Sequence, residues 1–83
     1  KEVPQRLASY LIFLSDNDNY NDSIELDVAK GQLANMLGTI PETLSRILSK
    51  MVDRNLSRVQ GRTIHLVDKN GLKTISTGER TLN

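Results

Sequence analysis

The spacing of hydrophobic residues changes several times along the chain, and each spacing predicts an element. Apolar residues three or four apart from Leu7 to Leu14, after a proline that suits a first helical turn, predict a helix ending at about Ser15. Residues 24–28 alternate apolar and polar side chains, which is typical of a short, half-buried strand. Residues 16–23 between them are mostly Asp, Asn and Ser and are expected to form a loop.

A helical spacing returns after residue 29. Leu33, Met36 and Leu37 form the apolar side of a predicted short helix. Gly38 follows directly and is expected to end that helix in the left-handed conformation, which glycine adopts without a steric penalty. A tight turn is therefore expected after residue 37.

A second helix is predicted from about Pro41 to about Arg54. Proline favours the first helical turn, and Thr39, three residues before Glu42, has the spacing of a capping box. Two short helices across a glycine turn are typical of a helix-turn-helix. The second helix has an apolar face and a polar face, the first formed by Leu44, Ile47, Leu48 and Met51 and the second by Glu42, Ser45, Arg46 and Ser49. The polar face carries the kinds of group that bind base edges in a DNA major groove.

The last part of the chain predicts a hairpin and one more helix. Residues 56–59 and 62–67 flank Gln60 and Gly61, where glycine supplies the positive φ of a tight turn. Residues 68–76 predict a short helix, and residues 77–83 are expected to be frayed. The whole order predicts a mainly α, α+β fold: a winged helix-turn-helix with a three-helix core and a small antiparallel β-wing.

Composition limits the class of protein. The 83 residues suit one domain, spanning 1–83, and the absence of cysteine excludes disulfides and thiolate metal sites, which favours a cytoplasmic protein. The longest apolar runs are far shorter than the ~20 residues that cross a bilayer, so no membrane partner is expected. The chain starts at Lys1 without a methionine and enters a helical pattern at once, so we expect a C-terminal piece of a longer protein.

The net charge of +1 hides an asymmetry along the chain. Residues 16–27 carry five acidic side chains and no basic one, a local charge of −5. Residues 28–62 carry six basic side chains and two acidic ones, a local charge of +4, and this segment includes the second predicted helix. The asymmetry favours a surface that faces a polyanion. On charge alone, an ordinary solvated helix face is an equally good interpretation.

Other chemistries find little support in the residues. The acidic loop lacks the ordered spacing and the closing Glu of an EF-hand, so no metal site is expected. The single histidine, His65, alternates with apolar neighbours and is expected on the outer face or edge of a strand. No acid–base pair converges, so we expect neither an enzyme nor a cofactor in this domain. Three aromatic residues are expected to pack in the core or loops and not to stack on single-stranded nucleic acid, namely Tyr10, Phe13 and Tyr20.

From Val3 to Val67 the sequence resembles the DNA-binding domain of the Crp/Fnr transcription regulators. Four stretches carry the resemblance: residues 31–38 (GQLANMLG), 41–48 (PETLSRIL), 55–56 (NL) and 61–64 (GRTI). The resemblance implies double-stranded DNA as partner, a sensor domain and dimerisation helix preceding this segment, and a homodimer in the full-length protein. It also implies contact of the full-length regulator with RNA polymerase. The cofactor, if any, of the missing region is unknown from this sequence.

Within that family, Pro41 directly before Glu42 makes the second helix similar to the Fnr type, for which a TTGA-like half-site is expected. The base-contacting residues implied are Glu42, Ser45 and Arg46, with Arg46 donating to guanine and Glu42 accepting from cytosine. The phosphate-contacting residues implied are Lys30, Thr39, Thr43 and Arg62. Two positions depart from the family pattern: Ala29 replaces a frequent Thr or Ser cap, and Ile40 replaces a polar residue.

Two other interpretations of the same residues stay open. Arg46 would pair with Glu42, four residues earlier, on a plain solvated helix. Alternatively, the winged helix would serve as a protein-interaction or dimerisation module without DNA binding, with the polar face of the second helix covered by another chain.

Overall fold

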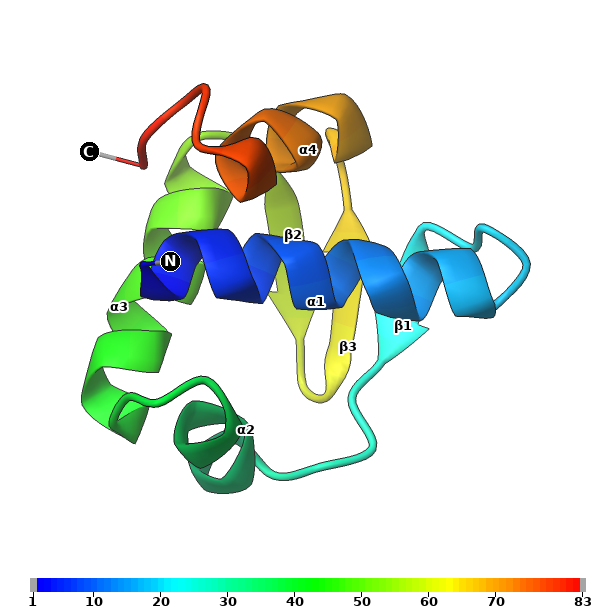
Figure 1. Cartoon of the computed structure of the whole chain (residues 1–83). Helices are drawn as coiled ribbons and strands as arrows, with labels where there is room; N and C mark the ends of the chain where they lie inside the picture. The colour runs from blue at the N-terminus through cyan, green and yellow to red at the C-terminus, as the bar shows by residue number, and fades with distance from the viewer. Residues whose placement is uncertain (1, 83) are drawn as a thin grey trace.

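The computed structural model describes residues 2–82 and contains, in this range, four helices and a three-stranded sheet (Figure 1). The predicted winged helix-turn-helix is confirmed. Residues 1 and 83 of the predicted domain lie outside the described range. The elements are α1 (Val3–Asn17), β1 (Ser23–Glu25), α2 (Lys30–Met36), α3 (Pro41–Asp53), β2 (Ser57–Gln60), β3 (Thr63–Leu66) and α4 (Lys69–Thr77).

The sheet is antiparallel, with strand order β1-β3-β2. Ile64 of the central strand β3 lies opposite Ile24 on one side and Val59 on the other, so these apolar side chains share the inner face. The sequence predicted the β2–β3 hairpin but not the addition of β1. His65 therefore lies on the central strand and not on an edge, and its partly exposed ring is on the outer face.

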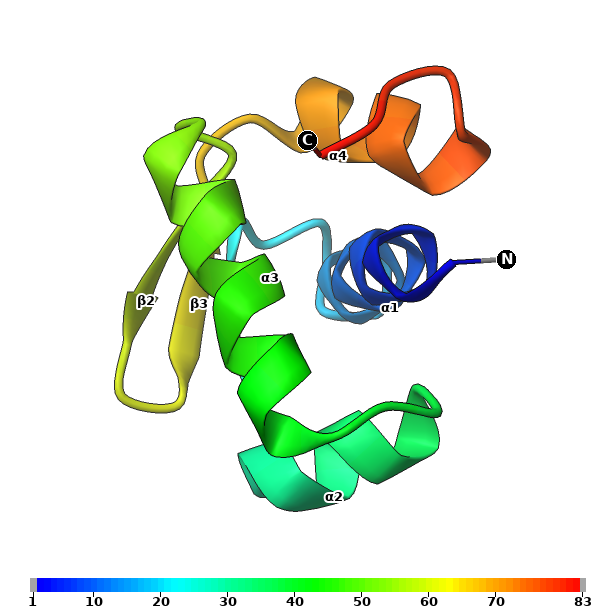
Figure 2. The ribbon, with the colours of Figure 1, turned by 90° about the vertical axis from the view of Figure 1, so that its left-hand side faces the viewer.

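The core lies between α1, α3, α4 and the inner face of the sheet. Leu7 and Leu11 of α1, Leu44 and Met51 of α3, and Leu72 of α4 are fully buried. In Figures 1 and 2, α1 lies between α2 and α4, and it packs most extensively against α4. The helical spacing read from the sequence therefore selected the residues that fill the core. Within residues 2–82, no helix has both the length and the hydropathy of a membrane span.

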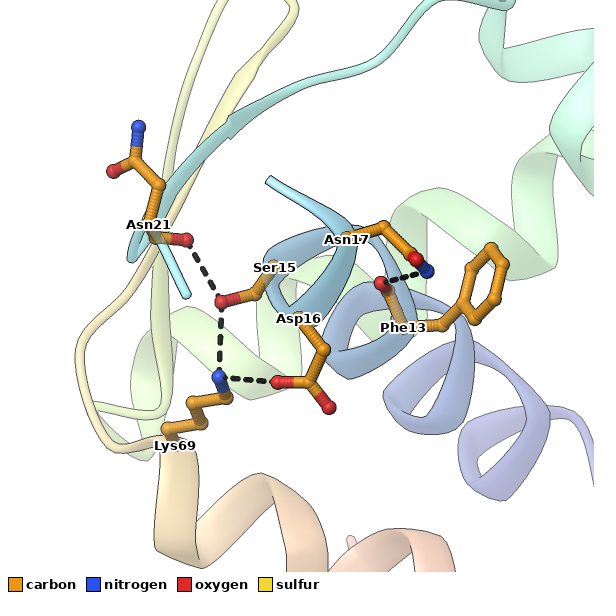
Figure 3. Close-up of polar contacts among 6 residues, drawn as sticks. All are labelled: Phe13, Ser15, Asp16, Asn17, Asn21 and Lys69. Carbon is orange, nitrogen blue, oxygen red and sulfur yellow. Dashed lines mark hydrogen bonds and ion pairs between the residues drawn. The ribbon is translucent and has the colours of Figure 1, made fainter. Parts of the chain in front are cut away.

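The end of α1 is tied to the start of α4 by polar contacts (Figure 3). Ser15 Oγ donates to the carbonyl of Asn21 at 2.8 Å and accepts from Lys69 Nζ at 3.0 Å. Lys69 Nζ also lies 2.7 Å from Asp16 Oδ1, and 5.4 Å from the centroid of the Tyr20 ring. The acidic loop predicted from composition is thus shorter, since α1 extends through Asn17, and it is anchored to α4 by one lysine.

Several side chains lie where the sequence did not predict them. Met36 is exposed, because Leu33, Ala34 and Leu37 cover the core and a residue one position before Leu37 points about 100° away from it. Phe13 is exposed because it lies two positions from both Leu11 and Ser15, on the opposite side of α1. Tyr20 in the following loop is exposed as well, so the predicted packing of these two rings in the core or loops is wrong, whereas Tyr10 packs against the core as predicted. Leu82 is buried against the core, so the chain is not frayed there; residue 83 lies outside the described range.

Candidate nucleic-acid interface

The turn between α2 and α3 is built from backbone hydrogen bonds. Leu37 is the C-cap of α2, and Gly38 follows with φ +75°, as predicted for a left-handed glycine. The amide of Thr39 donates to the carbonyl of Ala34 at 2.9 Å. The amide of Gly38 likewise donates to the carbonyl of Asn35 at 3.1 Å. The chain reverses at this turn, and Figure 2 shows α3 running away from α2 beside the sheet.

The capping box predicted at Thr39 is wrong. Ile40, one residue later, is the N-cap of α3, with extended φ −108° and ψ 157°, and no side chain caps the helix there. The carbonyl of Ile40 accepts from the amide of Leu44 at 3.0 Å and so makes the first intrahelical bond. The turn is one residue longer than the Thr39-to-Glu42 spacing assumes, which leaves Glu42 at the second helical position. Pro41, with its fixed φ, occupies the first position, as predicted.

The two faces of α3 are those predicted. Its buried residues are Leu44, Ile47, Leu48 and Met51, whereas Glu42, Ser45, Arg46 and Ser49 are exposed. Arg46 Nη2 lies 4.0 Å from Glu42 Oε2, with the side chains 69% and 77% exposed. A pair this long and this exposed stabilises a helix by only ~0.3–0.5 kcal/mol. Both charged groups therefore remain accessible to a ligand.

A surface depression of about 260 Å³ lies between α2, α3 and β2. Its lining includes Lys30 at the start of α2 and Ser45 on α3, so a predicted phosphate-contacting residue and a predicted base-contacting residue share one surface. The other lining residues are Leu48, Ser49, Val52, Asp53 and Val59. Among these lining residues, Lys30 is the one basic side chain and Asp53 the one acidic side chain.

The remaining predicted phosphate-contacting residues are distributed over the turn and the hairpin. Thr39 and Thr43 are half-buried at the start of α3. Arg62 is exposed at the hairpin tip, after Gly61 with its predicted positive φ of +62°, and its carbonyl accepts from the amide of Leu26 at 2.8 Å. In Figures 1 and 2 the hairpin tip, α2 and the N-terminal end of α3 lie at the same end of the molecule.

Within residues 2–82, no group of three His, Cys, Asp or Glu side chains is close enough to hold a metal ion. His65 Nδ1 lies 2.8 Å from Ser23 Oγ, a hydrogen bond across two strands. The pKa of Tyr10 on α1 is raised above its usual value by burial and, to a lesser extent, by the carboxylate of Asp27.

Arg6 is a residue that the sequence analysis missed. Its Nε and Nη2 atoms donate to the carbonyl oxygen of Leu37 at 3.1 Å and 2.9 Å, which links α1 to the α2–α3 turn. The available signal was a basic residue directly before the buried Leu7 of α1. Sequence spacing does not show that this position faces a distant turn.

Known proteins resemble this chain in sequence. The sequence profile of the family described as "Crp-like helix-turn-helix domain" matches residues 5–75. The transcriptional activator protein FnrA of Stutzerimonas stutzeri is 26% identical over 82 residues, which are 94% of this chain and 34% of that protein. The transcriptional regulatory protein btr of Bordetella pertussis is 33% identical over 75 residues, 86% of this chain and 31% of that protein. The chain thus spans about a third of the length of these curated relatives.

Solved structures share the fold. A mutant of CooA from Carboxydothermus hydrogenoformans matches with a TM-score of 0.81 and 30% identity, over 92% of this chain and 37% of that one. FixK2 from Bradyrhizobium japonicum matches with a TM-score of 0.80 and 24% identity, over 89% of this chain and 38% of that one. The second identity is low enough that it supports the fold alone.

Proposed function

Since the chain belongs to the Crp-like helix-turn-helix family, we propose that it is the sequence-specific, double-stranded DNA-binding domain of a transcription regulator. α3 enters the major groove and its exposed face contacts base edges. The observation that carries the proposal is the exposure of Glu42, Ser45 and Arg46 on the face of α3 opposite its buried leucines.

The base contacts follow from the chemistry of these three side chains. Arg46 donates two hydrogen bonds to O6 and N7 of a guanine, and Glu42 accepts from N4 of a cytosine. Ser45, one helical position from Arg46, is short enough to hydrogen-bond a base edge. Each good bidentate contact contributes ~1–3 kcal/mol of discrimination, several times the stabilisation from the weak Glu42–Arg46 pair. With Pro41 before Glu42, the expected half-site is TTGA-like.

The backbone contacts surround α3. Lys30, Thr39, Thr43 and Arg62 contact phosphates and position the helix without specifying sequence. Ile40 has no hydroxyl to offer a phosphate, so the free N–H groups in the first turn of α3 make that contact instead. The wing at Arg62 extends the footprint along the duplex.

We propose that this domain is one part of a longer regulator. The support is that relatives named as a transcriptional activator and a transcriptional regulatory protein are about three times as long as the segment that this chain matches. We propose a homodimer of the full-length protein, bound in the cytoplasm to a pseudo-palindrome whose half-sites lie about one helical turn apart. RNA polymerase is the further partner that activation requires. A single copy of the domain is expected to bind one half-site weakly.

The test is a titration of the domain with two labelled duplexes of equal length and base composition. One carries a TTGA palindrome and the other a scrambled version, and both are measured at several salt concentrations. The proposal predicts tighter binding to the palindrome, with both affinities falling as salt rises. Equal affinities for the two duplexes at every salt concentration would contradict sequence-specific recognition.

The alternative of a protein-interaction module makes a different prediction. It requires another chain to cover the polar face of α3, which is exposed in this chain. Amide chemical shifts recorded during the same titration separate the two functions. Shifts at Glu42, Ser45 and Arg46 support DNA binding, whereas their absence at saturating duplex supports the interaction module.

A further inference from the structure

We propose that Arg6 is a positioning residue for DNA recognition, which holds the α2–α3 turn and thereby sets where α3 begins. The inference rests on the proposed DNA-binding function of α3. Arg6 itself does not need to contact DNA for this role. It acts through the carbonyl of Leu37, which lies 31 positions later in the chain.

The geometry is a two-donor contact on one acceptor. Arg6 Nε and Nη2 both donate to the Leu37 carbonyl oxygen, at 3.1 Å and 2.9 Å, and the contact is partly buried. The planar guanidinium fork fixes direction as well as distance, because both donors must face the same oxygen. Among the side-chain hydrogen bonds of residues 2–82, these two are the ones that join α1 to the turn.

The acceptor lies where a helix needs a partner. The last carbonyls of a helix have no intrahelical donor, and its C-terminal end carries partial negative charge. At the end of α2, the carbonyls of Leu33, Ala34 and Asn35 accept from amides of the turn. The carbonyl of Leu37, the C-cap, accepts from a cation on another helix instead.

Besides the backbone hydrogen bonds of the turn, no side-chain cap holds the start of α3. Only Gly38, Thr39 and Ile40 separate Leu37 from the first residue of the helix. Gly38 has φ +75° and, as a glycine, can adopt a wide range of backbone angles, so no side chain at this position restricts the direction of the turn. A rotation there would swing the exposed face of α3, with Arg46, away from its base partners.

Arg6 lies on a helix that is packed into the core. The next two residues, Leu7 and Ala8, are fully buried, and α1 packs most extensively against α4. In Figure 1 the N-terminal half of α1 lies above the α2–α3 turn. The packing of α1 in the core therefore positions the Arg6 side chain. Its guanidinium group then holds the Leu37 carbonyl at the start of the α2–α3 turn.

The experiment compares two Arg6 variants with a control, Lys73→Gln, that changes the net charge by the same amount as Arg6→Gln. Arg6→Gln removes the charge and the fork, Arg6→Lys keeps the charge and one donor, and Lys73→Gln removes one charge from an exposed position on α4. Each variant is titrated with the TTGA-palindrome and scrambled duplexes at several salt concentrations. Amide hydrogen exchange at Gly38 and Thr39 is measured in the free protein.

We expect Arg6→Gln to lose about tenfold in affinity for the palindrome, equivalent to part of one base contact, with little change for the scrambled duplex. Its salt dependence should match the parent, because no phosphate contact is lost. Exchange at Gly38 and Thr39 should become faster. Arg6→Lys should recover part of both losses, and Lys73→Gln should behave as the parent.

Three results would overturn the proposal. The first is parental exchange at Gly38 and Thr39 in Arg6→Gln. The second is an equal loss for both duplexes with a shallower salt dependence, which would make Arg6 a direct phosphate contact. The third is a failure of both Arg6 variants to fold, which would make Arg6 a general determinant of stability. If the parent itself shows no preference between the duplexes, the proposed function fails, whereas the exchange data still test the turn.

Discussion

Arg46 Nη2 lies 4.0 Å from Glu42 Oε2 on adjacent turns of α3, and neither side chain is covered by the rest of the chain. The two charges are close enough to orient each other and too exposed to hold each other tightly. A G·C base pair offers acceptors on guanine and a donor on cytosine. An Arg and a Glu in this arrangement are therefore suited to replace their weak contact with each other by hydrogen bonds to the two bases.

Arg46→Ala should remove most of the preference for the TTGA palindrome. The lost guanine contact corresponds to ~1–3 kcal/mol, or about five- to 150-fold in affinity, while the scrambled duplex is affected much less. The measurement is the ratio of the two dissociation constants at one salt concentration. Lys73→Ala removes the same charge from an exposed position on another helix, α4, and should leave the ratio unchanged. An unchanged ratio in Arg46→Ala would rule out Arg46 as a base contact.

Arg62→Ala, at the tip of the hairpin, should weaken both duplexes alike. Phosphate contacts carry no sequence information, so the ratio of affinities should stay at the parental value. Loss of one such contact should reduce the slope of log affinity against log salt by about one unit. Lys30→Ala, at the start of α2, should behave in the same way. A selective loss for the palindrome would instead indicate base recognition by the wing.

Ile40→Thr should stabilise the protein, because it places a side-chain acceptor at the N-cap of α3, where none exists. The expected gain is about 1 kcal/mol in the free energy of unfolding. The Ile40 side chain is exposed, so its replacement removes little buried apolar surface. Urea denaturation measures it. Thr39→Ala is the comparison, because a capping box at Thr39 would make that change cost about 1 kcal/mol, whereas the structure predicts a smaller loss.

Lys69→Met should destabilise the protein by about 1 kcal/mol, because Lys69 Nζ contacts both Ser15 and Asp16 (Figure 3). Its side chain is 19% exposed and that of Asp16 45%, so solvent screens part of the attraction. The difference from the parent should shrink at high salt. Lys73→Met, exposed on the same helix, should change stability little. Equal effects of the two substitutions would show that the anchor contributes nothing.

Gly71→Ala should destabilise, although alanine is usually the better helix former. A Cβ at Gly71 would lie 2.6 Å from Asp68 Oδ2 and 2.6 Å from Leu56 Cδ2, so either the N-cap of α4 or the core must shift. We expect a loss of ~1–3 kcal/mol in thermal or urea denaturation. Gly31→Ala in α2, whose Cβ would meet only Pro41 at 4.0 Å, should stabilise by ~0.5–1 kcal/mol.

The sequence by itself determined the elements and the polar face of α3. Helical spacing selected the buried residues of α1 and α3, and glycine marked the left-handed positions at Gly38 and Gly61, because both signals are local properties of the backbone. The family motif identified the residues proposed to contact bases, Glu42, Ser45 and Arg46, and the structure places all three on the exposed face of α3. Of the residues proposed to contact DNA, Lys30 and Ser45 line the same depression.

Only the tertiary structure decided which distant segments meet. The pairing of β1 with β3, the anchor at Lys69 and the contact of Arg6 with Leu37 join residues 31 to 54 positions apart, and no periodicity encodes such partners. Turn length is equally hidden, since one extra residue moved the N-cap from Thr39 to Ile40. Which residues share one face of a helix follows from local backbone geometry, whereas the direction in which the helix points depends on the distant segments that pack against it.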